Sequence, residues 1–396
     1  MALIMTRRIT VLGATGSIGD STLDLIRRAN PGDFQVVALS ANRNVAKLTA
    51  LAIEFNAEFI ALGDVSLESE LKTALSGLSI EYGVGPEALI EAGRRSADFT
   101  MAAIIGAAGL EPTLAAVAQG KTVGLANKEC LVCAGDLFMT QVKTHGTTLL
   151  PIDSEHNAIF QVLEHDKPEG VRRLILTASG GPFRETAKHD LAQMTPQQAL
   201  KHPTWTMGAK ITIDSATLIN KGLELIEAAY LFDRPESEIG VVVHPQSIIH
   251  SMVEYIDGSV LAQMGAPDMR TPIAYALGWP DRMKAPVERL DLVKIGNLSF
   301  FEPDMERFPG LSLARESLRL GGRAPNIFNA ANEVAVDAFL NGHIGFMDIP
   351  AVVEGTLNRQ KGEGSFGKSL STVDDIISCD KDARLTANDL ILTLKS

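Results

Sequence analysis

A short apolar run, a glycine-rich turn and a helical segment follow one another near the start of the chain, and this succession constrains the fold more than any other feature. Residues 9–12 predict a buried strand, Gly13, Gly16 and Gly19 follow, and a helix is expected over residues 21–29. Glycines at this spacing allow a tight turn, a close approach of the backbone to a pyrophosphate, and close packing of the helix on the strand. The segment therefore predicts a dinucleotide-binding unit.

Strands and helices continue to alternate up to residue 152. The expected strands are 34–40, 59–62, 78–82, 99–105, 122–125 and 147–152. The expected helices are 45–55, 67–75, 86–94, 110–119 and 129–143. Strands that alternate with helices of this length predict a parallel, doubly wound (Rossmann-like) sheet, and hence an α/β N-terminal domain.

The pattern changes after residue 166. Short strands are expected at 171–178, 241–243, 251–255 and 259–264. They predict a central α+β domain with a mostly antiparallel sheet. An arm rich in Pro, Asp and Glu follows at residues 280–309, and a mainly helical C-terminal domain is expected from the segments 311–320, 327–340, 347–358 and 372–394.

Composition excludes several classes of protein. The 396 residues are 45% hydrophobic and carry a net charge of −12, which argues against nucleic-acid binding as the main function. A phosphorylated substrate remains compatible, because such sites use local cations and backbone amides. No apolar run approaches the roughly 20 residues of a membrane span. With three cysteines and no signal-peptide pattern at residues 1–8, we expect a cytoplasmic protein without membrane partners.

The end of the second expected strand indicates which dinucleotide binds. An NAD site usually has an acidic residue here, but residues 40–44 contain Arg43 and no acid. A guanidinium group fits a 2′-phosphate, so the sequence favours NADP(H). The alternative is that Arg43 is simply a basic residue at the start of the helix expected over 45–55.

An apolar run ends abruptly in Asp153 and Glu155. At the end of an extended segment, side chains two residues apart point to the same face, and two carboxylates there suit Mg²⁺ or Mn²⁺. The alternative is an ordinary junction between a strand and a helix, with Asp153 or Ser154 as the N-cap.

A clear helical segment at residues 218–232 offers a third carboxylate. Asn220 and Glu224 lie one turn apart on it, and Lys221 is three residues from Glu224. Together with Ser215, the amide and the ammonium group would form an anion clamp, and Glu224 could join the other two carboxylates. The alternative is an exposed ion pair between Lys221 and Glu224 that contributes little to stability.

The segment after the expected strand 171–178 contains a turn, Ser179-Gly180-Gly181, that suits a phosphate as well as it suits a plain tight turn. A long loop follows at residues 183–209, and it contains His202, Trp205 and Met207. Such a loop is often a lid over a site. Trp205 and Met207 could instead form a small core under the loop.

Taken together, these segments closely resemble the 1-deoxy-D-xylulose 5-phosphate reductoisomerase family. Six of them carry the resemblance in the family's order: 13–19 (GATGSIG), 126–129 (ANKE), 151–157 (PIDSEHN), 179–184 (SGGPFR), 220–224 (NKGLE) and 244–247 (HPQS). The resemblance implies rearrangement and NADPH-dependent reduction of 1-deoxy-D-xylulose 5-phosphate to 2-C-methyl-D-erythritol 4-phosphate in non-mevalonate isoprenoid biosynthesis. It also implies a divalent metal (Mg²⁺, Mn²⁺ or Co²⁺) and a homodimer.

The resemblance also assigns roles by position. The implied metal ligands are Asp153, Glu155 and Glu224, which count as catalytic together with Lys128 and His202. The implied substrate contacts are Lys128, Ser154, Glu155, Ser179, His202, Trp205, Met207, Ser215, Asn220, Lys221 and Glu224. The implied NADPH contacts are Thr15, Gly16, Ser17, Ile18, Asn42, Arg43, Asn44, Asn127, Glu129 and Gly208.

The implied domains are an NADPH-binding domain at 1–152, a catalytic domain that binds metal and substrate at 153–280, an arm at 281–310 and a helical domain at 311–396. The lid is expected at about 179–209. The chain departs from the commonest family pattern at Cys130, where Ser is expected, and at Asn42, where some members have Gly.

Two other functions are compatible with part of the sequence. An NADP-dependent semialdehyde or acyl-phosphate reductase shares the glycine turn, but Cys130 or Cys133 would have to be its nucleophile. These two cysteines fall in an apolar helical segment, where we expect them to be buried. A non-catalytic NADPH sensor would leave the carboxylates without a role.

Overall fold

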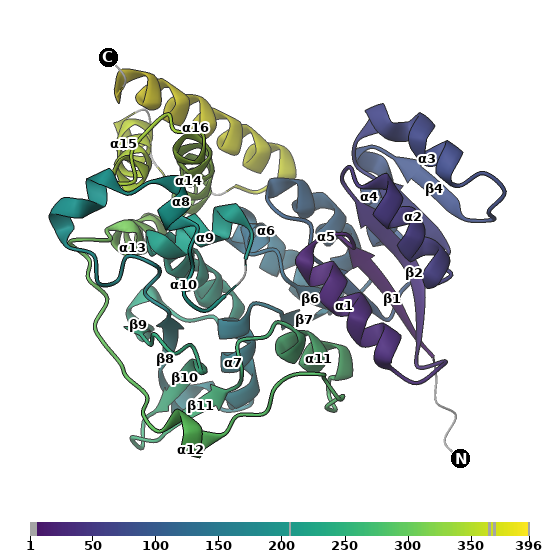
Figure 1. The fold of residues 1–396 in the computed structure, drawn as a ribbon, viewed down its shortest axis with the longest axis horizontal. Helices are drawn as coiled ribbons and strands as arrows, with labels where there is room; N and C mark the ends of the chain where they lie inside the picture. Colours follow the sequence, from purple (N-terminus) through teal and green to yellow (C-terminus); the bar gives the residue numbers. More distant parts are fainter. Residues whose placement is uncertain (1–5, 206, 363–365, 367–369, 395–396) are drawn as a thin grey trace. The chain divides into compact units, whose positions relative to one another are not determined.

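The computed structural model describes residues 6–205, 207–362, 366 and 370–394. The ends of the expected terminal domains (residues 1–5 and 395–396) and Thr206 in the expected lid lie outside this part. The chain forms two compact units (Figure 1). The first comprises residues 1–130, 138–157 and 268–287, and the second comprises residues 131–137, 158–267 and 288–396.

A seven-stranded sheet with the order β4-β3-β2-β1-β5-β6-β7 forms the centre of the first unit. Its strands are β1 (Arg7–Leu12), β2 (Phe34–Ala41), β3 (Phe59–Leu62), β4 (Glu81–Val84), β5 (Phe99–Ala102), β6 (Thr122–Leu125) and β7 (Thr148–Pro151). Every pairing is parallel, which confirms the predicted doubly wound sheet. Its helices are α1 (Ser17–Arg28), α2 (Val45–Glu54), α3 (Glu68–Ala74), α4 (Pro86–Arg94), α5 (Leu110–Val117) and α11 (Arg270–Gly278).

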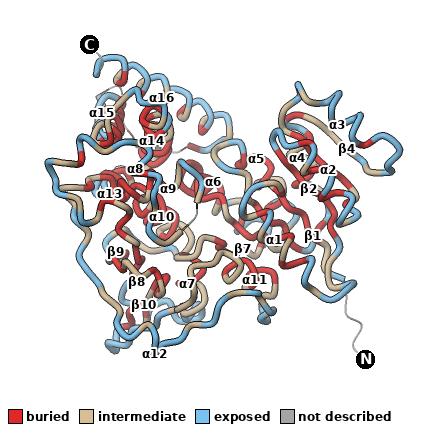
Figure 2. Tube along the Cα trace, in the orientation of Figure 1, coloured by how far each residue is buried: buried red, intermediate tan, exposed pale blue. Residues whose placement is uncertain are grey.

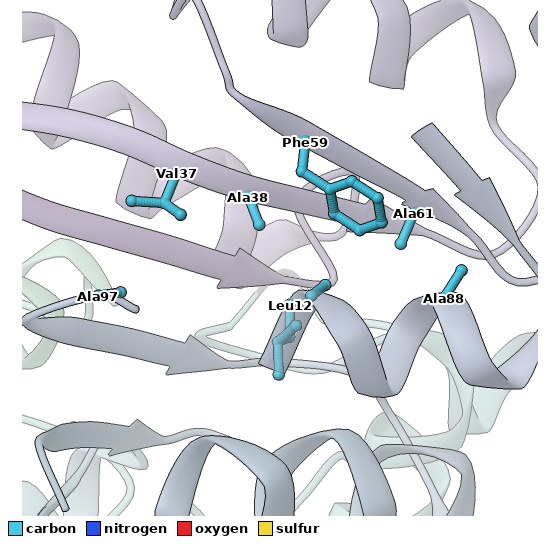
Figure 3. Packing of buried hydrophobic residues seen from close by; sticks show 8 residues of the cluster. Leu12, Val37, Ala38, Phe59, Ala61, Ala88 and Ala97 are labelled. Carbon is cyan, nitrogen blue, oxygen red and sulfur yellow. The ribbon is translucent and has the colours of Figure 1, made fainter. Parts of the chain in front are cut away.

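Small side chains let a helix pack closely on this sheet. Leu12, Val37, Ala38 and Phe59 form a buried cluster with the alanines of the neighbouring elements (Figure 3). A Cβ atom at Gly83 would lie only 2.8 Å from the Cβ of Ala88 on α4. The burial of these apolar groups stabilises the edge of the sheet from which the predicted cofactor-binding segments project.

The second unit contains a four-stranded sheet with the order β11-β10-β8-β9. Its strands are β8 (Val171–Ala178), β9 (Ile239–Val243), β10 (Ile249–Tyr255) and β11 (Val260–Met264). Strand β10 pairs antiparallel with β8 and β11, whereas β8 and β9 are parallel. The sheet is therefore mixed.

The second unit also contains helices, several of which form the C-terminal part of the chain. They are α8 (Pro196–Ala199), α9 (Ala209–Ala216), α10 (Ile219–Leu231), α12 (Leu292–Ile295), α13 (Gly310–Leu320), α14 (Ala324–Leu340), α15 (Asp348–Gly362) and α16 (Val373–Leu394). Helices α10 and α14 are largely buried (Figure 2). Two further helices, α6 (Glu129–His145) and α7 (Ser154–Val162), contribute residues to both units.

Several segments differ from the expectation, and among them the strand expected at 78–82 lies at Glu81–Val84. The strand expected at 99–105 ends at Ala102. The loop expected at 183–209 contains a 3₁₀ helix, η4 (Lys188–Gln193), and helix α8, which begins with a capping box between Thr195 and Gln198. Among the described residues, no helix is both long enough and apolar enough to cross a membrane.

Candidate functional site

The glycine turn of the first unit has the geometry that its spacing predicts. Gly13 has φ +86°, and a Cβ atom there would lie 2.5 Å from the carbonyl oxygen of Ala103. A Cβ atom at Gly19 would lie 2.5 Å from the carbonyl oxygen of Gly13, so the start of α1 packs directly on the turn. Gly16 is the N-cap of α1 and provides no side-chain cap. The first amide groups of α1 are therefore not satisfied by a capping side chain, as an anion site requires.

A lysine that we did not select from the sequence lies beside this turn. The Lys47 ammonium group donates to the Thr15 carbonyl oxygen at 3.1 Å and to Asp20 Oδ2 at 2.5 Å. Its helix, α2, is capped by the Asn44 side chain, which accepts from the Lys47 amide at 3.1 Å. Lys47 was missed because it lies in a segment with no motif, 32 residues after Thr15.

Arg43 projects from the end of β2 and is 67% exposed. Its guanidinium lies 2.5 Å from Oδ2 of Asp64, which follows the neighbouring strand β3. Hydrogen bonds from Ser66 and the charge of Arg43 lower the pKa of the Asp64 carboxyl group, so it stays ionised at neutral pH. The neighbouring Asn42 is also exposed, and its Oδ1 would be 2.9 Å from a Cβ at Gly63.

Asn127 organises the loop that follows β5. Its amide group donates to the carbonyl oxygens of Ile104 and Gly106 at 2.5 and 3.0 Å, and its Oδ1 accepts from the Cys130 amide at 3.2 Å. These contacts fix the start of α6, where Lys128 and Glu129 are both buried. Strand β5 ends at Ala102, and the carbonyl oxygens of Ile104 and Gly106 beyond its end bind the Asn127 side chain.

Asp153 lies between β7 and α7, and Glu155 lies in the first turn of α7. Asp153 Oδ1 accepts from the Glu155 amide at 3.2 Å, which is an N-cap contact, and Oδ2 lies 2.9 Å from the Lys128 ammonium group. Ser154 Oγ lies 2.6 Å from Glu155 Oε2, and His156 Nδ1 lies 3.9 Å from Asp153 Oδ1. The cap that we considered as an alternative is therefore present. It occupies one oxygen of Asp153, and the other faces a cation.

In the second unit, the side chains of Asn220, Lys221 and Glu224 lie together at the start of α10. Asn220 donates to Oε1 of Glu224, and Lys221 donates to Oε2. Leu218, with φ +58°, separates α9 from α10. Lys221 and Glu224 are both buried, so the alternative of an exposed surface pair does not hold. A buried carboxylate needs such partners.

The turn after β8 is joined to the expected lid by a histidine. His202 Nδ1 accepts from the amides of Thr204 and Trp205, at 3.2 and 2.9 Å, so its proton is on Nε2. Nε2 lies 2.9 Å from Ser179 Oγ, which also accepts from the Gly181 amide at 3.2 Å. Burial lowers the pKa of His202 and favours this neutral form. The Ser179 hydroxyl accepts two hydrogen bonds and keeps its proton available for an external acceptor.

Ser215 and the loop tryptophan lie near this turn. Gly181 has φ +69°, and a Cβ there would be 2.8 Å from the Ser215 carbonyl oxygen, so the end of α9 packs on the turn. The ring of Trp205 lies 6.1 Å from that of His250, a buried residue of β10 that we did not select because it lies outside every motif, directly before the expected strand 251–255. Met207 is half-buried, and Gly208 is the N-cap of α9.

The structure thus groups the candidate residues into two sets. In the first unit lie Thr15, Gly16, Ser17, Ile18, Asn42, Arg43, Asn44, Asn127, Lys128, Glu129, Asp153, Ser154 and Glu155. In the second unit lie Ser179, His202, Trp205, Met207, Gly208, Ser215, Asn220, Lys221 and Glu224.

Comparison with known proteins identifies the family. The model described as 1-deoxy-D-xylulose 5-phosphate reductoisomerase matches residues 9–135, and two models of the C-terminal domain of that enzyme match residues 149–232 and 264–386. The 1-deoxy-D-xylulose 5-phosphate reductoisomerase of Bradyrhizobium sp. (strain ORS 278) is 58% identical over 385 residues, which cover 97% of this chain and 94% of the relative. The chain belongs to the 1-deoxy-D-xylulose 5-phosphate reductoisomerase family.

Solved reductoisomerases also share its fold. The enzyme from Zymomonas mobilis in complex with NADPH has a TM-score of 0.92 and 54% identity, and the match covers 98% of this chain and 99% of that one. A reductoisomerase in complex with NADPH, fosmidomycin and magnesium has a TM-score of 0.93 and 45% identity, with the same coverage. Cys130 and Cys133 are buried, as expected for a structural role.

Proposed function

We propose that the chain catalyses the NADPH- and divalent-metal-dependent rearrangement and reduction of 1-deoxy-D-xylulose 5-phosphate to 2-C-methyl-D-erythritol 4-phosphate. The observation that carries this function is the 58% identity to a reductoisomerase over nearly the whole chain. The solved relative with NADPH, fosmidomycin and magnesium supports both cofactors. Family membership therefore favours this reaction over a cysteine-dependent reductase and over a non-catalytic sensor.

Asp153, Glu155 and Glu224 are our proposed ligands of one Mg²⁺, Mn²⁺ or Co²⁺ ion. Carboxylate oxygens are the ligands that such ions prefer, and each unit keeps a lysine beside its carboxylate, Lys128 beside Asp153 and Lys221 beside Glu224. When bound, the ion would polarise the substrate carbonyl group.

The phosphate of the substrate is proposed to bind in the second unit. The Ser179 hydroxyl group accepts two hydrogen bonds, so its own proton can be donated to the phosphate. Neutral His202 holds this hydroxyl group in place. Ser215, Asn220 and Lys221 would complete the clamp with a hydroxyl, an amide and an ammonium group. The remaining proposed substrate contacts are Lys128, Ser154, Glu155, Trp205, Met207 and Glu224. A phosphate held in this way positions the reacting carbons, which is how binding energy assists a rearrangement.

NADPH is proposed to bind to the first unit. The uncapped start of α1 would receive the pyrophosphate through Thr15, Gly16, Ser17 and Ile18, and Arg43 would face the 2′-phosphate. Asn42, Asn44, Asn127 and Glu129 of the first unit would complete this set, and Gly208 of the second unit is the further NADPH contact that the family implies. Arg43 already pairs with Asp64, so the 2′-phosphate of NADPH would have to compete with Asp64 for the guanidinium group. The Arg43 side chain is 67% exposed, which makes it accessible to the phosphate.

We further propose the functional division of the chain that the family implies. It consists of an NADPH-binding domain at 1–152, a catalytic domain at 153–280 with a lid at about 179–209, an arm at 281–310 and a helical domain at 311–396. We place the enzyme in the cytoplasm. His202 contacts both the Trp205 amide and the Ser179 hydroxyl group. This histidine would therefore couple the loop around Trp205 to the proposed phosphate clamp.

A second copy of this chain is the proposed partner of strand β11. Strand β11 is the last strand of its sheet, and Val260 and Leu261 on it are 49% and 44% exposed. An edge strand has unpaired backbone groups, and apolar side chains there favour pairing with another chain. We expect a dimer in sedimentation experiments and a monomer for Leu261→Lys.

The function is tested by following NADPH oxidation with 1-deoxy-D-xylulose 5-phosphate after chelation, with and without added Mn²⁺. Oxidation that requires both substrate and metal is the expected result. Oxidation that is independent of metal would contradict the proposed metal site but would still be consistent with an NADPH-dependent reductase. Absence of oxidation in a protein that binds NADPH would contradict the proposed reaction.

A further inference from the structure

Helix α9 carries Ser215, but its own sequence does little to hold it in place. It has eight residues, and its N-cap, Gly208, makes no side-chain cap. Helices this short are marginal in isolation, so their orientation depends on tertiary contacts. One such contact is the packing of Gly181 on the Ser215 backbone.

A second contact is made by a buried carboxylate. Asp214, directly before Ser215, is 1% exposed. Its Oδ1 accepts from Asn332 Nδ2 at 2.8 Å, and its Oδ2 lies 2.9 Å from the ammonium group of Lys210, one turn earlier on the same helix. Lys210 therefore moves with α9, whereas Asn332 belongs to α14. The hydrogen bond to Asn332 is the one of these two contacts that joins α9 to another helix.

Helix α14 is a firm support for this contact. It has 17 residues, most of them are buried, and Asn332 is fully buried. A carboxylate can only accept, so the amide nitrogen of Asn332 must face it, and the orientation of the side chain is determined. Successive residues of a helix are rotated by a fixed angle about its axis. Fixing Asp214 against α14 therefore also fixes the direction in which Ser215 projects.

We propose that Asn332, acting through Asp214, is a positioning residue for the Ser215 hydroxyl group in the phosphate clamp. The proposal rests on the proposed function of Ser215. Asn332 lies 117 residues after Ser215 and outside every motif that carried the family resemblance. Its contribution is to hold the hydroxyl group where the substrate phosphate binds, without touching the substrate.

The test compares two buried asparagines of α14. Asn332→Leu removes the donor to Asp214 and keeps the branched shape of the side chain, although leucine is larger. Asn326→Leu is the matched control, because Asn326 is equally buried on the same helix but donates to the carbonyl oxygens of Cys133 and Ile376. We expect Asn332→Leu to raise the KM for 1-deoxy-D-xylulose 5-phosphate by about tenfold and to change kcat by less than about twofold, as for the loss of uniform binding. Asn326→Leu is expected to lower only the unfolding midpoint.

Asn332→Ser is the milder variant should the leucine variant not fold, since its hydroxyl group is too short to reach Asp214. An unchanged KM in a folded Asn332 variant, or an equal rise in Asn326→Leu, would overturn the proposal. Ser215→Ala separates it from the proposed function. If Ser215→Ala leaves KM unchanged, the clamp itself is wrong, whereas a raised KM in Ser215→Ala alone contradicts only the role of Asn332.

Discussion

The ammonium group of Lys128 lies 2.9 Å from Oδ2 of Asp153, and the two side chains are only 9% and 12% exposed. The second unit repeats this relationship between Lys221 and Glu224, which are more deeply buried. Burying a carboxylate alone is costly, and a neighbouring cation reduces that cost. Each unit thus places a cation beside a buried carboxylate, and an ionised carboxylate is the form that a divalent ion requires.

Glu224→Gln is expected to abolish metal-dependent turnover and to spare NADPH binding. The amide keeps the shape of the side chain but removes the charge, so we expect Mn²⁺ affinity, measured by calorimetry without substrate, to fall roughly 100-fold. Glu238→Gln is the control, because Glu238 is 38% exposed and pairs with Arg234 just beyond α10. Retained turnover at saturating Mg²⁺ would rule out Glu224 as a ligand.

Arg43→Ala is expected to weaken NADPH binding far more than NADH binding. Loss of a charge-assisted contact to the 2′-phosphate should weaken NADPH about tenfold or more, while NADH lacks that group. Fluorescence titration with each dinucleotide measures the two affinities. Arg28→Ala provides a control, since Arg28 is an exposed arginine on α1 that pairs with Asp24. Equal losses for the two dinucleotides would exclude this role.

Acid should destabilise the fold through His202. Burial lowers its pKa in the folded state below the ordinary value of 6.5, so the unfolded chain binds more protons than the folded chain between the two values. The contribution of His202 to stability is therefore fully present above pH 6.5 and is lost as pH falls towards the lowered pKa. Urea unfolding measured from pH 7.5 to 5 should show a shallower decline for His202→Gln than for the parent chain. Parallel declines would contradict the prediction.

Gly13→Ala is expected to destabilise the fold and to abolish tight NADPH binding. A positive φ costs a residue with a Cβ about 1–2 kcal/mol, and at Gly13 the added atom would also collide with the backbone of Ala103. Gly32→Ala isolates the cost of the positive φ, because Gly32 has φ +92° but nothing lies within 4 Å of the added Cβ atom. Denaturant unfolding and NADPH titration of both variants separate the cost of the positive φ from the effect of the collision with Ala103. Comparable losses of stability in the two variants would show that the collision has no effect.

Local chemistry made much of the fold predictable. The glycine turn could be predicted because steric limits act between residues within one βα unit, and Gly13 and Gly19 behave as their spacing requires. Strand β8 has the predicted bounds because its apolar run is bounded by turn residues. The contact between Asn220 and Glu224 followed from helical periodicity alone.

The tertiary structure decided what depends on groups distant in the sequence. Periodicity could not show that Lys221 and Glu224 are buried, because burial depends on which helices cover α10. Neither the Arg43–Asp64 pair nor the Asn332–Asp214 hydrogen bond follows a local rule, since 21 and 118 residues separate the partners. The sequence by itself determined the elements, the family and the residue types of the site. The pairing of side chains, which fixes their charge and direction, came only from packing that brings remote segments together.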